Sequence, residues 1–100
     1  MVVPTAATLT KAQTRRLAIM AQDGMARALR PIHTPLDGDI VFAAATCERP
    51  LREPIVHSLG ELGTLAADVV ARAIARGVYE ARALPFTGAV PSWRDKFATR

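Results

Sequence analysis

Residues 33–46 read His-Thr-Pro-Leu-Asp-Gly-Asp-Ile-Val-Phe-Ala-Ala-Ala-Thr, an acidic turn followed by an almost wholly apolar run. The run opens with β-branched and aromatic residues, a pattern typical of a strand that is covered on both faces. We expect this strand to extend from Ile40 to Ala45. Because two strands alone do not make a stable sheet, a strand of this kind needs neighbours. The stretch therefore predicts a sheet that is completed by sequence outside the 100 residues.

The residues before the turn predict a short strand and a long helix. Val2–Thr5 is typical of a short extended segment, with Pro4 at an edge or strand end because proline donates no backbone hydrogen bond. Thr10–Gln13 has the form of a capping box, which marks a helix start. Residues 31–38 contain two prolines and a glycine, so the helix should end before Pro31. Between these two bounds, apolar or small residues recur at spacings of three and four, at Leu17, Met20, Ala21, Gly24, Met25 and Ala28.

A second helix is predicted after a loop at Cys47–Pro54. It should run from about Ser58 to Tyr79, and the inclusion of Gly63 in its apolar stripe lets another element approach closely. Charges spaced four residues apart on its other side could pair, Asp68 with Arg72 and Arg76 with Glu80. The stripe itself consists of Leu59, Leu62, Ala66, Val69, Val70, Ala73 and Ile74.

The last segment, Ala83–Arg100, contains two prolines and a glycine. It is interpreted either as a docking arm anchored by Phe86 and Trp93 or as a frayed end. The expected order is strand, helix, strand, helix, which is an α+β fold. Residues 1–100 would then form a single partial domain, since their thin Ala-, Val-, Leu- and Ile-based core gains from a partner surface.

Composition excludes several classes of protein. The net charge of +4 is spread over helices and tail rather than interleaved with aromatics, which favours solvated helix faces over nucleic-acid binding. A single cysteine, Cys47, cannot form an internal disulfide and fits a reducing compartment. No signal peptide and no run of the length of a membrane span is visible, so we expect a cytoplasmic location.

Asp37 and Asp39 are the closest pair of reactive side chains that the sequence offers as a candidate site. In an extended backbone, carboxylates at i and i+2 project to the same side, and Gly38 allows close approach of chain or substrate. Such a pair could transfer a proton or orient a nucleophile, although spacing alone favours an ordinary polar turn before a strand. His33 is close enough in sequence to reach the turn, but a loop histidine is more often structural.

Other chemistries have little support from spacing. A metal site would need both aspartates together with His33 or His57, and no metal-ligand motif is present. Ser58 and Ser92 have no base at a recognisable spacing, and Cys47 has no Cys-His pattern around it. Phosphate-loop and dinucleotide fingerprints are also absent from the sequence. We therefore expect no metal and no cofactor.

The order of features resembles the carboxy-terminal portion of the DmpA-type aminopeptidases, a family of L-aminopeptidase/D-esterases, β-peptidyl aminopeptidases and nylon-oligomer hydrolases. The most specific part of this resemblance is His33–Phe42. The resemblance spans nearly the whole chain, through Val2–Thr5, Leu9–Gln13, Arg15–Ala18, Asp23–Gly24, Ala26–Arg27, His33–Phe42, Leu65–Ile74 and Trp93–Asp95.

The resemblance implies a self-processing N-terminal-nucleophile hydrolase with a four-layer αββα sandwich. In the family, the Thr or Ser nucleophile begins a strand of the form Thr-Thr-Ile-Gly-Val-Val-Ala-Thr, so Val2 and Val3 match the valine pair and the nucleophile lies before Met1. Asp37 and Asp39 match the family's acidic pair, which is thought to orient and activate the nucleophile. They are the catalytic residues that the resemblance assigns to this chain.

The resemblance further implies partners. The chain would work with a missing upstream subunit of the same precursor, on a small peptide or amide substrate, in a homo-oligomer, and would be inert alone. The alternative hypothesis is a small basic helical module that binds a partner or nucleic acid. Changes at Asp37 or Asp39 should not affect such a module.

Overall fold

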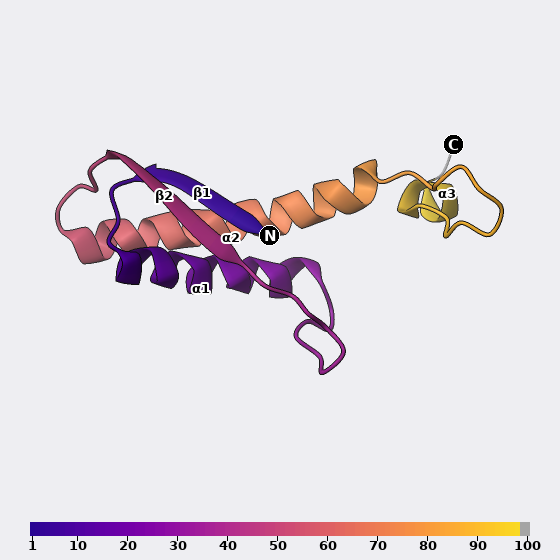
Figure 1. The fold of residues 1–100 in the computed structure, drawn as a ribbon, viewed down its shortest axis with the longest axis horizontal. Helices are drawn as coiled ribbons and strands as arrows, with labels where there is room; N and C mark the ends of the chain where they lie inside the picture. Colours follow the sequence, from indigo (N-terminus) through magenta and orange to yellow (C-terminus); the bar gives the residue numbers. More distant parts are fainter. Residues whose placement is uncertain (99–100) are drawn as a thin grey trace.

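The computed structural model describes residues 1–98 (Figure 1). It confirms the α+β class and the order strand, helix, strand, helix, with a short helix added near the C-terminus. Strands β1 and β2 pair in parallel as a two-stranded sheet. The elements are β1 (Val2–Ala7), α1 (Lys11–Ala28), β2 (Phe42–Arg49), α2 (Ile55–Glu80) and α3 (Trp93–Phe97).

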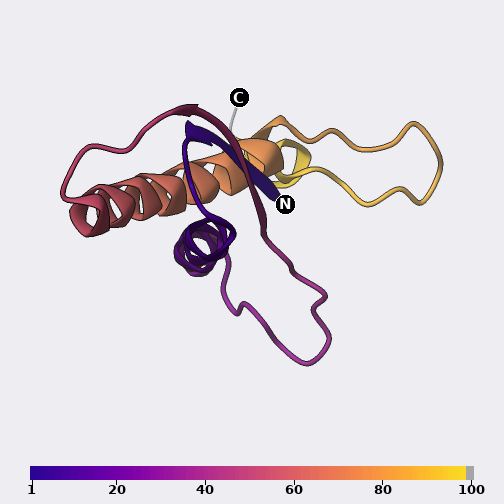
Figure 2. The same cartoon turned by 60° about the vertical axis from the view of Figure 1, so that its left-hand side comes forward.

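The sheet lies over one side of the helix pair, which gives two layers (Figure 2). Helices α1 and α2 make the most extensive contact in the chain, and α1 also contacts β2. The predicted capping box starts α1: the Gln13 N–H donates to the Thr10 hydroxyl at 3.1 Å, and the Thr10 N–H donates to the Gln13 side chain at 2.9 Å. As predicted, the helix ends before Pro31.

The predicted bounds of the second strand were wrong at both ends. Pairing begins at Val2 with Phe42, so Ile40 and Val41 precede β2 instead of opening it. At the other end β1 continues to Ala7, which pairs with Arg49, so the first residues of the predicted loop belong to β2. The register shifts between Thr5 and Ala7, and in the shifted part of β2 Cys47 has a φ of 58°. The length of β1 therefore decides where β2 ends.

The second helix begins at Ile55, three residues before the predicted start at Ser58. Pro54 occupies its N-cap with φ −75°, close to the value that the proline ring imposes, so the chain enters the helix directly after it. Across the helix pair, Asp68 forms an ion pair with Arg27 of α1 instead of the predicted pair with Arg72. The predicted pair of Arg76 and Glu80 is confirmed, with Nε and Oε1 3.0 Å apart.

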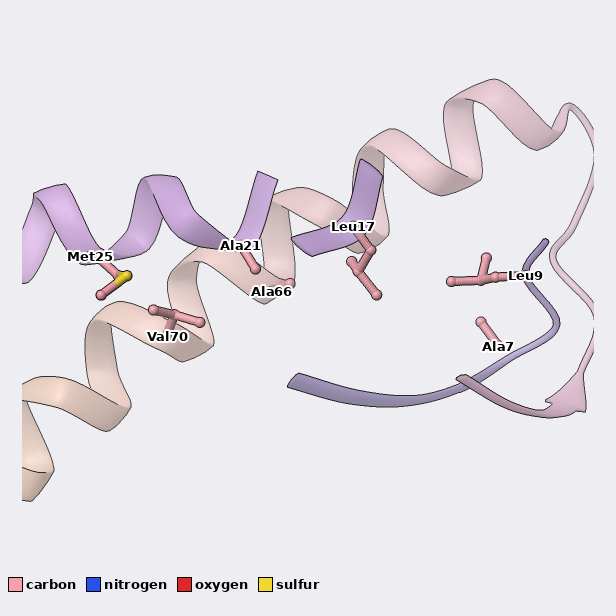
Figure 3. Close-up of a cluster of buried hydrophobic side chains, with 7 residues drawn as sticks. All are labelled: Ala7, Leu9, Leu17, Ala21, Met25, Ala66 and Val70. Atoms are coloured by element: carbon pink, nitrogen blue, oxygen red, sulfur yellow. The ribbon is translucent and has the colours of Figure 1, made fainter. Parts of the chain in front are cut away.

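The core lies between the helices and one end of the sheet (Figure 3). Leu17 and Val70 are its two largest fully buried side chains, and most of the others are small. This composition agrees with the thin aliphatic core expected from the sequence. The buried cluster consists of Ala7 and Leu9, of Leu17, Ala21 and Met25 from α1, and of Ala66 and Val70 from α2.

Two glycines let α1 and α2 approach closely. A Cβ added to Gly24 would lie 2.1 Å from the carbonyl oxygen of Ala67, and one added to Gly63 would lie 2.3 Å from Sδ of Met20. Both distances are far below van der Waals contact. The close approach predicted at Gly63 is therefore confirmed, and Gly24 is an equally tight position that the apolar spacing marked only as part of a stripe.

The C-terminal segment turns back so that α3 meets the end of α2. The Trp93 and Tyr79 rings lie 5.9 Å apart between centroids, and the Arg94 guanidinium lies 5.1 Å from the centre of the Tyr79 ring. Phe86 lies in the connecting loop and is largely exposed. The end of the predicted docking arm, residues 99–100, lies outside the described residues, and the docking role of residues 83–100 stays a prediction.

Helix α3 should lose its N-terminal cap in acid. The Ser92 hydroxyl and backbone N–H both donate to the Asp95 carboxylate, and these hydrogen bonds lower the pKa of Asp95 from its ordinary value. Because the folded-state pKa is depressed, the stabilisation is present above the unfolded value and is lost as pH falls through the folded one. We expect the fluorescence of Trp93, the single tryptophan, to change below about pH 4 as α3 frays. Asp95→Asn should lack this step, and the same step in both proteins would contradict the assignment.

Within residues 1–98, the helices are too short or too polar to cross a membrane.

Candidate functional site

The acidic turn lies in the connection between α1 and β2. The Asp37 N–H donates to the Thr34 carbonyl at 3.0 Å, and the Thr34 N–H donates to Oδ2 of Asp37 at the same distance. The Asp37 carboxylate therefore closes its own turn by accepting from the backbone three residues earlier, one of the local side-chain-to-backbone bonds that aspartate forms. Sequence reasoning missed the part played by Thr34, although an aspartate three residues after a threonine and two residues after a proline is a recognisable turn signal.

Asp39 follows this turn and has different surroundings. Its side chain is exposed, and among the described residues it makes no hydrogen bond or ion pair. It lies directly before Ile40, whose carbonyl accepts a hydrogen bond from the Met1 ammonium group at 3.0 Å. The two aspartates thus have different surroundings: Asp37 is held by the turn, and Asp39 is exposed and makes no side-chain bond within residues 1–98.

The start of β1 lies beside the acidic turn. Besides the contact of its ammonium group with Ile40, Met1 accepts a hydrogen bond from the Phe42 N–H at 2.9 Å. The two strands are parallel, and residues in their first half pair with a constant offset, Val2 with Phe42 and Val3 with Ala43. Any group at the N-terminal end of β1 is therefore directed toward the residues just before β2, which include Asp39.

The other candidate residues from the sequence are not joined to this pair. His33 is exposed, with a left-handed backbone (φ 57°), and no hydrogen bond links it to either aspartate within residues 1–98. Cys47 is exposed, with its Sγ 3.8 Å from the Leu9 carbonyl oxygen. The Ser58 hydroxyl donates to the Arg52 carbonyl at 2.6 Å, and Ser92 caps α3. In the part of the chain that is described, no three His, Cys, Asp or Glu side chains are grouped to hold a metal ion.

The rim of the site is apolar and uncovered. Val2, Ile40 and Phe42 are 63%, 56% and 57% exposed. Val2 and Phe42 begin the two strands, and Ile40 lies just before β2, next to the turn. Val3, Val41 and Ala43, which alternate with them, pack against the core. One face of the sheet is thus covered by helices, while apolar side chains of the other face meet solvent at the level of the acidic turn. A site formed here needs a further layer to exclude water.

Comparison with known proteins gives one consistent family. The family model for peptidase family S58 matches residues 1–90. An uncharacterized aminopeptidase of Mycobacterium tuberculosis (strain ATCC 25618 / H37Rv) is 43% identical over an alignment of 100 residues. This alignment covers 91% of this chain and 28% of that protein. The corresponding uncharacterized aminopeptidase of Mycobacterium bovis gives the same values, and that of Mycobacterium leprae is 42% identical over 92 residues, 83% of this chain and 25% of the relative. The chain thus spans little more than a quarter of the length of these relatives.

Proposed function

This chain belongs to peptidase family S58, and we propose that it is the C-terminal portion of a self-processing aminopeptidase or amidohydrolase that cleaves amide or ester bonds. The observation that carries the proposal is the parallel register of β1 and β2. It brings the N-terminal end of β1 beside Ile40, the residue that directly follows Asp39. The enzyme's nucleophile would be a Thr or Ser on that end of the strand.

The register can be continued beyond the described strand. Residues in the first half of β1 pair with residues forty positions later, as Val2 does with Phe42. In the family pattern Met1 takes the place of the glycine, and the nucleophile stands three residues before it. With the same offset, that residue would lie opposite Gly38, with one aspartate on either side. Because Gly38 has no side chain, it would leave room for the nucleophile and substrate.

The roles of the two aspartates follow from their surroundings. Asp37 is bound to the backbone of Thr34, so it is suited to hold the shape of the turn. Asp39 is exposed and unbonded within residues 1–98, so its carboxylate can accept a hydrogen bond from the nucleophile or its free amine. A terminal Thr or Ser can use its own amine as the base. An adjacent carboxylate would orient that amine and stabilise its protonated form.

The uncovered sheet face supports a partner from the same precursor. A sheet face with exposed apolar side chains such as Val2 and Phe42 is the kind of surface that another sheet covers in a sandwich. We propose that the upstream subunit supplies this second sheet and completes a four-layer αββα sandwich. It would also supply the groups that bind substrate and oxyanion. The chain alone would then be inert.

The complete enzyme would act on small peptides or amides, as a homo-oligomer, in the cytoplasm, where a lone Cys47 stays reduced. The alternative, a basic binding module, has weaker support. Three of its arginines, Arg27, Arg76 and Arg94, lie in ion pairs with acidic side chains. This pairing reduces the positive charge available for a nucleic-acid backbone.

Self-processing can be tested on the complete precursor. We expect mass spectrometry and N-terminal sequencing of the purified protein to find a second subunit that begins with Thr or Ser three residues before Met1. The chain of residues 1–100 alone should not hydrolyse amino-acid p-nitroanilides. A precursor that remains a single uncut polypeptide but is active would contradict the proposal, as would hydrolysis by the isolated chain.

A further inference from the structure

Strands β1 and β2 lie side by side, and each has one outer edge (Figure 1). In a ladder, the N–H and C=O of alternate residues point to the partner strand, and those of the residues between them point away. The Ile40 carbonyl and the Phe42 N–H both bond to Met1, so Ala43 and Ala45 direct their backbone groups away from β1. Within residues 1–98 no third strand pairs with these groups. The outer edge of β2 is therefore open to a further strand.

The outer edge of β1 is different because it contains Pro4. Met1 bonds to β2 through both its nitrogen and its carbonyl, so Val2 and Pro4 direct their backbone groups away from β2. The Pro4 nitrogen carries no hydrogen, and this edge therefore lacks a donor at its middle. Within sheets, proline is confined mainly to edge strands, with its nitrogen on the unpaired side. Of the two strands, β2 is the one suited to continue the sheet.

A groove lies beside the start of β2. It is lined by residues 41–43 and by Lys11, Thr14, Arg15 and Ala18 of α1, and it takes no residue from β1 or α2. It therefore lies along β2 on the side away from β1. Lys11 and Arg15 are its charged side chains, and neither has an ion-pair partner within the described residues. A strand at the open edge would place side chains over this groove, opposite two cations.

We propose that the open edge of β2 binds an extended segment from the upstream part of the same precursor, with an acidic side chain that faces Lys11 and Arg15. The segment would bond to the backbone of Ala43 and Ala45, and β1 would remain the outer strand of this sheet. The aligned residues make up 28% of the Mycobacterium tuberculosis relative, so a precursor of that length has ample chain for such a segment. The inference rests on the proposed function for the identity of the partner.

A second copy of the chain fits the open edge less well than an acidic segment does. If two copies paired through their β2 edges, the two grooves would meet, and Lys11 and Arg15 of both copies would gather without a counter-charge. Like charges brought together across an interface disfavour association. An acidic side chain on the incoming segment supplies the missing counter-charge, so charge complementarity favours the segment over the second copy.

Replacement of Arg15 tests the acidic side chain. In the complete protein, Arg15→Glu should lower the Tm by about 2–4 °C, because it places two acids together across the new strand contact. The matched control is Arg16→Glu, which is exposed in the same turn of α1 but lies outside this groove, so it changes the charge of the helix equally. It should shift the Tm by less than about 1 °C. Equal shifts in the two variants, or no shift in Arg15→Glu, overturn the proposal.

Hydrogen exchange of single backbone amides tests which edge is paired. In the complete protein, the amides of Ala43 and Ala45 should exchange at least a hundredfold more slowly than that of Val2. The Val3 amide, which faces β2, is the protected reference. Fast exchange at Ala43 and Ala45, or equally slow exchange at Val2, overturns the proposal. Protection that rises with protein concentration also overturns it, since it would indicate pairing with a second copy.

The exchange measurement separates this inference from the proposed function. It is made both on the protein as purified and on a variant whose proposed Thr or Ser nucleophile is replaced by alanine, so its result does not depend on cleavage. Protection at Ala43 in a protein that never cuts itself would support the strand contact and contradict self-processing. Self-cleavage without that protection would have the reverse meaning.

Discussion

Replacing Gly24 with alanine is expected to lower the free energy of unfolding by about 2–3 kcal/mol, near the upper end for overpacking in a close-packed core. The added methyl group would lie 2.1 Å from the Ala67 carbonyl oxygen and 3.0 Å from Cβ of Val70. The nearest atom is backbone, which cannot rotate away as a flexible side chain can. Helices α1 and α2 would have to separate, and their contact is the largest in the chain. Urea denaturation followed by circular dichroism measures the loss.

The matched control is Gly77→Ala. Gly77 is also helical, but no atom lies within 4 Å of the position its Cβ would take. Alanine is favoured over glycine inside a helix by about 1 kcal/mol, so this variant should be as stable as the original or slightly more stable. The opposite signs are the distinguishing result. If both substitutions stabilise the chain, the close approach of the helices at Gly24 is wrong.

The sequence predicted elements well where the signal is local. Thr10 and Gln13 mark the start of α1 within a stretch of four residues, and the reciprocal hydrogen bonds between them are present. The bounds of β2 depend instead on how far β1 extends and on the register shift between Thr5 and Ala7. Neither follows from the composition of residues 40–49. Likewise, Asp68 pairs with Arg27 of another helix, which a spacing rule within one helix does not include.

In the candidate site, too, local features were predicted from the sequence and long-range contacts were not. Spacing and resemblance both indicate Asp37 and Asp39, but they treat the two carboxylates as equivalent. The difference between them comes from the backbone of Thr34, which binds Asp37, and from the position of Met1 beside Ile40. The contact of Met1 with Ile40 joins segments that are 39 residues apart in the sequence. A pairing of that range is fixed by the parallel sheet, and no local pattern encodes it.

Replacing Asp39 with asparagine in the complete enzyme is expected to lower kcat/KM about 10²–10⁴-fold, the usual contribution of a positioned acid-base group. Asparagine has nearly the same shape as aspartate but cannot carry the negative charge that would orient and stabilise a protonated amine. Asp39 is exposed and outside regular structure, so its replacement should leave folding intact. Steady-state hydrolysis of amino-acid p-nitroanilides, together with the extent of self-cleavage, measures the effect.

Asp37→Asn should have a smaller effect than Asp39→Asn, because an amide oxygen can still accept the hydrogen bond from the Thr34 N–H. Asp37→Ala removes that acceptor, so it should loosen the turn and reduce activity more than Asp37→Asn does. Asp23→Asn, an exposed acid on α1, is the control and should leave activity unchanged. If Asp37→Asn proves the more harmful of the two asparagine substitutions, then Asp37 rather than Asp39 faces the nucleophile, and the turn must rearrange when the upstream subunit binds.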